Sequence, residues 1–258
     1  MGRDKNKRSL EKLSDLQREI GDIHQLFSSS YPVTIVENNV LYIYDLVQSD
    51  KYDLVKTVAS PFPVPVGVRA AFPLEAYDMK ISAVVTGDVF DSKEGYVTIL
   101  HEFVHCAQYN SCEADLKEGL DIWRKYRLEN NHTWEISHSF PYDNKAFIDL
   151  FSQYNDSLAQ ADIYKAKAIR MDLMKTLGRL DFEYLIWQEW KEGLARYIEN
   201  EIRARLGLKG NHYGHGKPYT RISFYESGSE YIRLIDREKA EIVGDMGSLF
   251  FEMNTDVF

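Results

Sequence analysis

The chain has 258 residues, of which 44% are hydrophobic and 13% aromatic, enough for the core of a globular protein. Its net charge of −9, with no basic stripe among aromatic residues, argues against nucleic acid as a partner. No apolar run reaches the roughly 20 residues of a membrane-spanning helix, and the charged start lacks the apolar core of a secretion signal, so we expect a soluble protein whose compartment stays unknown, because a leader could have been removed.

The first part of the chain predicts one helix followed by strands. From Ser9 to Phe27 apolar residues recur every three or four positions, which is typical of an amphipathic helix. From Tyr31 onward apolar and polar residues alternate, and Asn38-Asn39 between two such runs predicts a hairpin with a two-residue turn. Three further segments rich in β-branched residues predict strands: Leu54–Val58, Val64–Phe72 and Ile81–Val85. We therefore expect a mostly antiparallel sheet over residues 31–90.

The rest of the chain, residues 91–258, predicts mainly helices. Asp91, with Glu94 three positions later, is a capping signal that opens the first of them. Apolar periodicity predicts further helices over residues 114–128, 146–177 and 182–206, the last closed by Gly207. Because no repeat, low-complexity stretch or linker interrupts the chain, residues 1–258 are predicted to form one α+β domain, a short sheet followed by a helical bundle.

The sequence His101-Glu102-Phe103-Val104-His105 has the pattern H-E-x-x-H inside the first of these helices. Residues four apart in a helix lie on one face, so His101 and His105 can both direct a ring nitrogen to one ion. Zn²⁺ accepts imidazole ligands and, in a catalytic site, keeps one position for water, from which Glu102 is placed to take a proton. The alternative is a chance spacing, but the apolar neighbours predict a buried helix, in which an unpartnered glutamate would be strongly destabilising. We therefore predict a metal site here.

A catalytic zinc site normally has three protein ligands, so a third must come from elsewhere in the chain. Glu192, in a later helix, is the preferred candidate, because the small residues Gly193 and Ala195 would let that helix approach the H-E-x-x-H helix closely. Two alternatives stay open. Glu192 could form an ion pair with Arg196 one turn later on a solvated face, or Glu189 could supply the ligand.

The motifs resemble those of the gluzincin metallopeptidases, which carry H-E-x-x-H on one helix and a glutamate on a later one, often within E-G-x-A-x-Y. Members of the aminopeptidase-like branch also carry Y-x-x-G further along the chain. The matching residues here, beyond the first motif, are Glu192-Gly193-x-Ala195-x-Tyr197 and Tyr225-x-x-Gly228. The resemblance covers residues 80–236, and the order of the motifs agrees with that of the family.

This resemblance implies a zincin-like fold and a zinc ion held by His101, His105 and Glu192. It also implies that the hydroxyl of Tyr225 faces the tetrahedral intermediate. One feature of the family is missing, because Arg196 stands four positions after the glutamate, where an acidic residue usually helps to orient the histidines. Some other group must therefore orient them, and the sequence does not name it.

Two classes of function follow from these residues. The first is a zinc-dependent peptidase that acts on a peptide or protein, with Glu102 as the general base and Tyr225 holding the developing oxyanion. The second is a catalytically silent binding or structural protein with the same fold. The intact Glu102 favours the first, since a structural zinc site usually closes with four ligands and has no use for a neighbouring base. The sequence does not separate an aminopeptidase from an endopeptidase.

A peptidase also needs a surface that holds its substrate in an extended form. An exposed sheet edge can do this, because the peptide adds to the sheet as one more strand. We expect Ile81–Val85 to be that edge, with Ala83, Val84 and Val85 as the substrate-binding residues.

Two further pairs of residues could be reactive but have simpler interpretations. Cys106 and Cys112 could form a disulfide only if the helix that carries Cys106 ended by about Tyr109, so we expect two reduced thiols. His212 and His215 lie in a glycine-rich loop. We expect them in solvent, although either could donate a hydrogen bond to a transition state.

Overall fold

The computed structural model describes residues 2–46 and 51–255. Over these residues the protein is α+β, with a five-stranded sheet in the N-terminal part followed by helices, as expected. The chain forms two compact units, one of residues 1–110 and 198–210 and the other of residues 111–197 and 211–258. The single domain over residues 1–258 stays a prediction. None of the described helices is long and apolar enough to cross a membrane.

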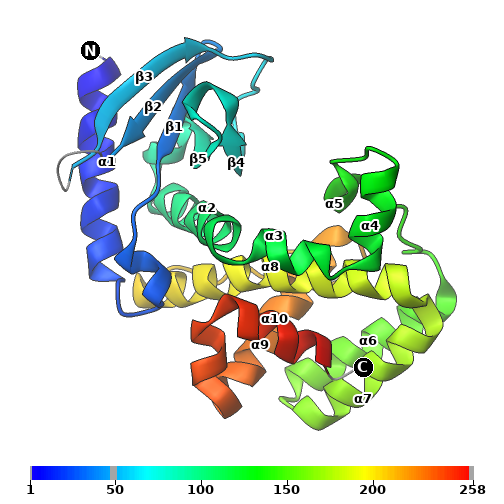
Figure 1. Ribbon diagram of the computed structural model, residues 1–258. Helices are drawn as coiled ribbons and strands as arrows, with labels where there is room; N and C mark the ends of the chain where they lie inside the picture. The colour runs from blue at the N-terminus through cyan, green and yellow to red at the C-terminus, as the bar shows by residue number, and fades with distance from the viewer. Residues whose placement is uncertain (1, 47–50, 256–258) are drawn as a thin grey trace. The chain divides into compact units, whose positions relative to one another are not determined.

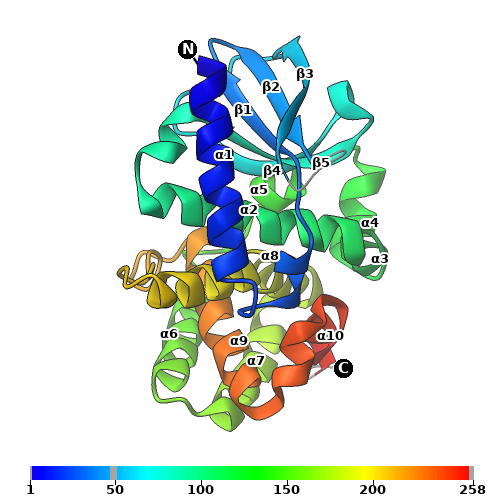
Figure 2. The same ribbon diagram turned by 90° about the vertical axis from the view of Figure 1, so that its left-hand side faces the viewer.

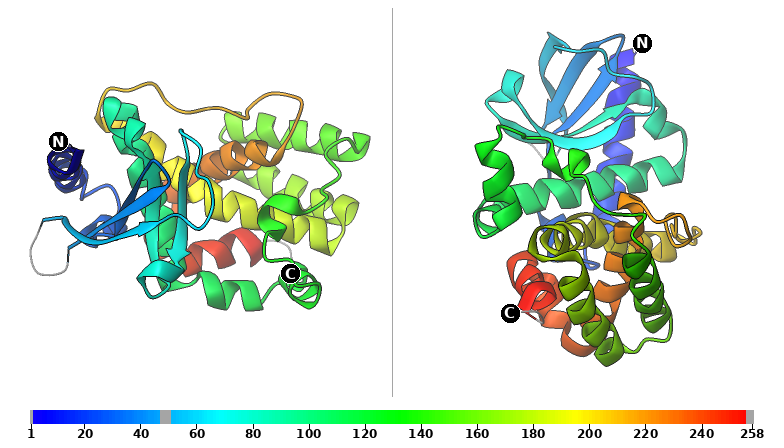
Figure 3. Two further views of the ribbon diagram at one scale, coloured as in Figure 1. Left: turned by 90° about the horizontal axis from the view of Figure 1, so that it is seen from above. Right: turned by 90° about the vertical axis from the view of Figure 1, so that its right-hand side faces the viewer.

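The sheet belongs to the first unit and has the strand order β3-β2-β1-β5-β4 (Figures 1 and 3). Its strands are β1 (Val33–Glu37), β2 (Val40–Asp45), β3 (Asp53–Ala59), β4 (Arg69–Leu74) and β5 (Lys80–Thr86). Neighbouring strands are antiparallel except β1 and β5, which run parallel. The sheet is therefore mixed.

Local turn chemistry explains two of the strand boundaries. Asn38 and Asn39 have φ of 51° and 58°, so they form the two-residue turn predicted between β1 and β2. Asparagine tolerates this left-handed conformation, which the favoured hairpin turns require. The strand predicted from Val64 begins only at Arg69, because Pro65 has no N–H to donate to a ladder and Gly67 turns with a φ of +93°.

The prediction that Ile81–Val85 is a sheet edge is wrong. The strand β5 pairs with β1 on one side and with β4 on the other, and Ala83, for example, lies opposite both Val33 and Ala71. Its backbone groups are therefore already used, and the substrate-binding role expected for Ala83, Val84 and Val85 is excluded. All three are at most 1% exposed. An unbroken apolar run is typical of a central strand buried on both faces, and alternation alone carries no information on strand order.

Helices complete the first unit. The helix α1 (Gly2–Glu19) runs along the sheet (Figure 2), and its Asn6 donates a hydrogen bond to Glu37 at the end of β1. It overlaps the range predicted from Ser9 to Phe27 but begins earlier and ends at Glu19. Its charged first residues are good helix formers without an apolar pattern. A short 3-10 helix, η1 (Gln25–Ser28), follows and is capped by His24. Two others, η2 (Glu75–Tyr77) and η3 (Gly87–Asp91), flank β5.

The helix that carries the H-E-x-x-H motif is α2 (Lys93–Ser111). Ser92 caps it, accepting from the N–H of Gly95 at 3.1 Å, whereas the expected cap Asp91 ends the preceding 3-10 helix. The helix continues past Tyr109, and both Cys106 and Cys112 are free, as predicted.

The second unit is a set of helices around an aromatic core. Its helices are α3 (Glu113–Glu118), α4 (Asp121–Leu128), α5 (Trp134–Ser137), α6 (Lys145–Ala159), α7 (Ile163–Leu177), α9 (Arg221–Gly244) and α10 (Met246–Thr255). The helix predicted over residues 114–128 is broken at Gly119, and the one over 146–177 at Ala161, which has a φ of 56°. The helical spacing of apolar residues continues across such short breaks, so this spacing did not predict them.

The longest helix, α8 (Arg179–Arg205), contributes to both units, because its residues from 198 onward belong to the first. It begins three residues before the predicted start and ends before Gly207, whose φ of +66° closes it as expected.

Candidate metal centre

His101 and His105 lie one turn apart on α2 and face the same way. Their ring centroids are 5.0 Å apart, and each offers a ring nitrogen within 4.8 Å of the other. Both side chains are largely buried, His105 being 8% exposed. Two imidazoles at this separation can share one ion, as predicted from their spacing.

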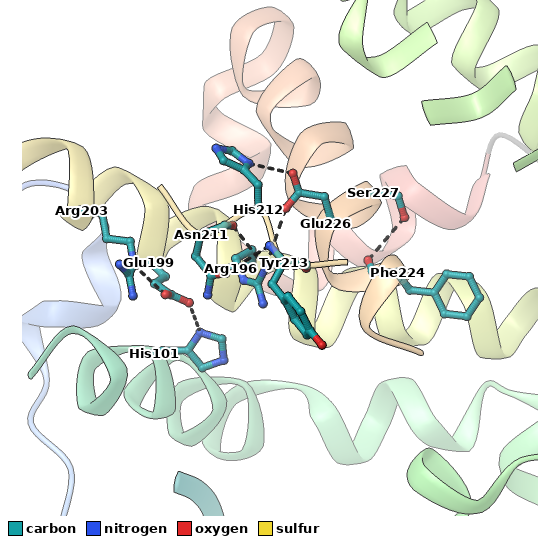
Figure 4. A network of polar contacts seen from close by, with 10 residues as sticks. All are labelled: His101, Arg196, Glu199, Arg203, Asn211, His212, Tyr213, Phe224, Glu226 and Ser227. Atoms are coloured by element: carbon teal, nitrogen blue, oxygen red, sulfur yellow. Dashed lines mark hydrogen bonds and ion pairs between the residues drawn. The ribbon is translucent and has the colours of Figure 1, made fainter. Parts of the chain in front are cut away.

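A carboxylate orients His101. Its Nδ1 lies 3.0 Å from Oε2 of Glu199 on α8 (Figure 4). An ionised carboxylate only accepts, so Nδ1 carries the proton and Nε2 keeps its lone pair. Glu199 is held in turn, since its other oxygen accepts from Nε of Arg203 at 2.7 Å, and Arg203 also donates to the carbonyl of Lys209.

The side-chain amide of Gln108 orients His105 in the same way as Glu199 orients His101. Its Nδ1 lies 3.0 Å from Oε1 of Gln108, which is fully buried three positions along the same helix. A carbonyl oxygen only accepts, so Nδ1 of His105 is also the protonated nitrogen. The lone pairs of both rings are therefore on Nε2, the arrangement in which metal-bound histidines usually occur.

These two partners are the orienting groups that the sequence did not name. The family pattern indicates the position four residues after Glu192, which is Arg196, whereas Glu199 lies seven positions after Glu192 and so on the same face of α8. Gln108 follows His105 by three positions, a spacing at which helical side chains meet. Both partners could have been found by helical spacing.

Glu102 lies between the two histidines in sequence and is 6% exposed. Burial raises the pKa of the neighbouring Cys106 thiol, and the negative charge of Glu102 raises it further. Cys106 therefore stays protonated near neutral pH and is a packed thiol, without the thiolate that a nucleophile or metal ligand needs.

In the second unit, Glu192 and Tyr225 lie side by side. Burial raises the pKa of the Tyr225 hydroxyl, and the Glu192 carboxylate, its hydrogen-bond partner, raises it further. Tyr225 is therefore a phenol that donates. The backbones of α8 and α9 meet here, because a Cβ on Gly193 would be 2.7 Å from Cα of Gly228. The glycines of the two motifs thus bring Glu192 and Tyr225 together, which is a role for Gly193 that the sequence did not indicate.

Arg196 does not lie on a solvated face, as the alternative ion pair with Glu192 would require. Arg196 is 5% exposed, donates to the carbonyls of Asn211 and Tyr213 at 3.2 Å, and lies 3.8 Å from Glu226 (Figure 4). It therefore fixes the loop before α9 and is no part of a solvated face.

Glu189, the other candidate ligand, is committed elsewhere. It is fully buried, forms an ion pair with Arg170, and accepts a hydrogen bond from Oγ of Ser227 at 2.6 Å. Arg170 is also fully buried and donates to Tyr154 and to the carbonyl of Met253. Both carboxylate oxygens of Glu189 are occupied, so we assign it to the core of the second unit.

Glu189→Gln is expected to lower the free energy of unfolding by about 3–5 kcal/mol, because it leaves the Arg170 guanidinium buried without a counter-charge. Folded Glu189→Gln protein should hold as much zinc as the parent. Glu192→Gln, the matched change three positions later, should lower the zinc content and leave the free energy of unfolding nearly unchanged. Urea unfolding and elemental analysis of both variants test this, and loss of zinc from folded Glu189→Gln protein would contradict the assignment.

A second group of potential ligands lies in the second unit. It consists of His212, Glu226 and Glu230. His212 lies 2.8 Å from Glu226, and Glu230 pairs with Arg233. Since Arg196 lies near Glu226 and Arg233 pairs with Glu230, no metal is needed to explain these carboxylates. His212 and His215 are exposed, as expected for loop residues, and a hydrogen bond from either to a transition state stays a prediction.

The candidate centre therefore rests on this chain's own residues. Glu199 and Gln108 orient His101 and His105 on α2, and Tyr225 lies beside Glu192. Glu189 is engaged by Arg170 and Ser227, and β5 is paired on both sides. No protein-family model, curated protein or solved structure matches the chain.

Proposed function

We propose that the protein is a zinc-dependent peptidase that holds zinc through Nε2 of His101, Nε2 of His105 and a carboxylate oxygen of Glu192. The observation that carries the proposal is that both Nδ1 atoms face acceptors, each at 3.0 Å, so Nε2 is the nitrogen of each ring that can bind a metal. Two neutral imidazoles and one carboxylate form a ligand set of catalytic zinc sites, in which the fourth position stays open.

The continuity of α8 supports Glu192 as the third ligand. Residues seven apart in a helix lie on one face, about 10 Å apart along its axis. Glu199 contacts His101, so the face of α8 that carries Glu199 is the one directed to the histidines, and Glu192 lies on that same face. Its neighbour Tyr225 would then stand next to the metal.

Each residue has a distinct task in this proposal. Zinc, when bound, polarises the scissile carbonyl and lets water act as a nucleophile near neutral pH. Glu102 takes the proton from the attacking water and passes it to the leaving amine. Tyr225, whose hydroxyl stays protonated, donates a hydrogen bond to the oxygen on which negative charge develops.

The orientation of His101 gives a direct test. Glu199→Ala removes the acceptor from Nδ1, so the ring can turn and the other tautomer becomes populated. Loss of such an orienting partner typically weakens metal affinity about 10–100-fold. Competition with a chromophoric zinc chelator measures the change. Glu201→Ala, an exposed position on the same helix, is the control and should keep the parental affinity. Equal affinities for the two variants would refute the role of Glu199.

A further inference from the structure

Within the described part of the chain, no carboxylate forms an ion pair with the cation Arg221. It is the first residue of α9 and is partly buried. Among the residues that the structure describes, none forms an ion pair or hydrogen bond with its guanidinium, which lies over the ring of Tyr225, 5.5 Å from the centroid. Burying part of a charge without a counter-charge is unfavourable, so this arginine is available to an anion.

Arg196 is a second guanidinium at the same ring, and it has partners within the protein. Arg196 also lies over the ring of Tyr225, 5.9 Å from its centroid, but it has Glu226 and two carbonyl oxygens as partners. Tyr225 thus contacts two guanidinium groups, one already engaged within the protein and one not. The available one is Arg221.

The position of Arg221 relates it to the proposed chemistry. Tyr225 lies one helical turn after Arg221 on α9. Burial raises the pKa of Tyr142, Tyr184 and Tyr225, and the charge of Arg221 opposes that rise in all three. The guanidinium therefore lies near three phenol groups, one of which, Tyr225, is hydrogen-bonded to Glu192, the proposed metal ligand.

We propose that Arg221 binds a carboxylate of the peptide substrate close to the bond that is cut. A guanidinium presents two parallel N–H donors that match a carboxylate, and the ring of Tyr225 holds its plane. The proposal rests on the peptidase function above. The carboxylate is either the free C-terminus of the peptide or the side chain of an Asp or Glu next to the scissile bond. In a protein with a net charge of −9, such a site distinguishes substrates that the rest of the surface would repel.

A peptide mixture distinguishes these sources. The probes are tetrapeptides of mixed sequence with free amino and carboxyl termini and the same mixture with amidated carboxyl termini, and mass spectrometry follows each cleavage. The parent protein should prefer free termini if the C-terminal carboxylate is bound, or Asp and Glu over Asn and Gln in both mixtures if a side chain is bound. Arg221→Ala should lower kcat/KM for the preferred peptides about 10–100-fold, as expected for loss of a charged hydrogen bond, and leave their uncharged counterparts within about threefold.

Two further variants guard against a merely structural effect. Arg221→Lys keeps the positive charge but lacks the two parallel N–H donors of a guanidinium. It should therefore retain part of the preference for carboxylate-bearing peptides that Arg221→Ala loses. Arg237→Ala, an exposed arginine on the same helix, should behave as the parent. An equal loss on charged and uncharged peptides, or a parent without any preference, would overturn the proposal.

A binding measurement distinguishes failure of the role proposed for Arg221 from failure of the peptidase function. If the parent protein cleaves neither mixture, the peptidase function fails. The immobilised parent and Arg221→Ala proteins are then used to retain peptides from each mixture. A preference for carboxylate-bearing peptides that Arg221→Ala abolishes supports the role of Arg221, and its absence refutes it.

Discussion

Glu102→Gln is expected to lower turnover of a cleaved peptide by about 10²–10⁴-fold, the usual contribution of a general base, while leaving the zinc content nearly unchanged. Glutamine has the size and most of the hydrogen-bonding capacity of glutamate, so the packing of a side chain that is only 6% exposed should survive. It cannot take a proton. Steady-state kinetics on a peptide that the parent cleaves, together with elemental analysis, measure both quantities.

The control for this prediction is Glu94→Gln. Glu94 is an exposed residue in the first turn of the same helix, and its replacement should leave turnover unchanged. If cleavage survives Glu102→Gln, Glu102 is not the base. If the parent protein shows no zinc-dependent cleavage of a broad peptide library, the catalytically silent binding protein becomes the better hypothesis.

His101→Ala and His105→Ala should each reduce bound zinc from about one ion per chain to nearly none after dialysis against a weak chelator. Each change removes one of the three proposed ligands, and two remaining ligands do not make a stable zinc site. Elemental analysis gives the metal content directly. Thermal unfolding gives a second readout, because a ligand that binds only the folded state raises the melting temperature of the parent, and added zinc should not raise that of the variants.

His132→Ala is the matched control, because His132 is exposed in the loop that precedes α5. The His132→Ala protein should hold as much zinc as the parent, and added zinc should raise its melting temperature as it does for the parent. Parental zinc in His101→Ala and His105→Ala proteins would place the metal elsewhere and remove the basis of the proposed function.

Several features of this protein could be predicted from local sequence. The pattern around Asn38-Asn39 predicted the hairpin of β1 and β2, and periodicity with a terminal glycine predicted α8 and its end. The spacing of His101 and His105 predicted that they share a face of one helix. Each of these depends on residues within a few turns or one hairpin, where backbone geometry alone relates sequence distance to spatial distance.

Other features depended on parts of the chain that the sequence places far apart. Strand β5 is central because β4 and β1 both pair with it, and its apolar run is compatible with an edge or a centre. Glu189 and Glu192 look alike in sequence, yet only Glu189 meets the buried Arg170. His101 finds its orienting carboxylate 98 positions away, in Glu199. Strand order and the pairing of buried charges are settled by packing and desolvation over the whole fold, which is why only the tertiary structure decided them.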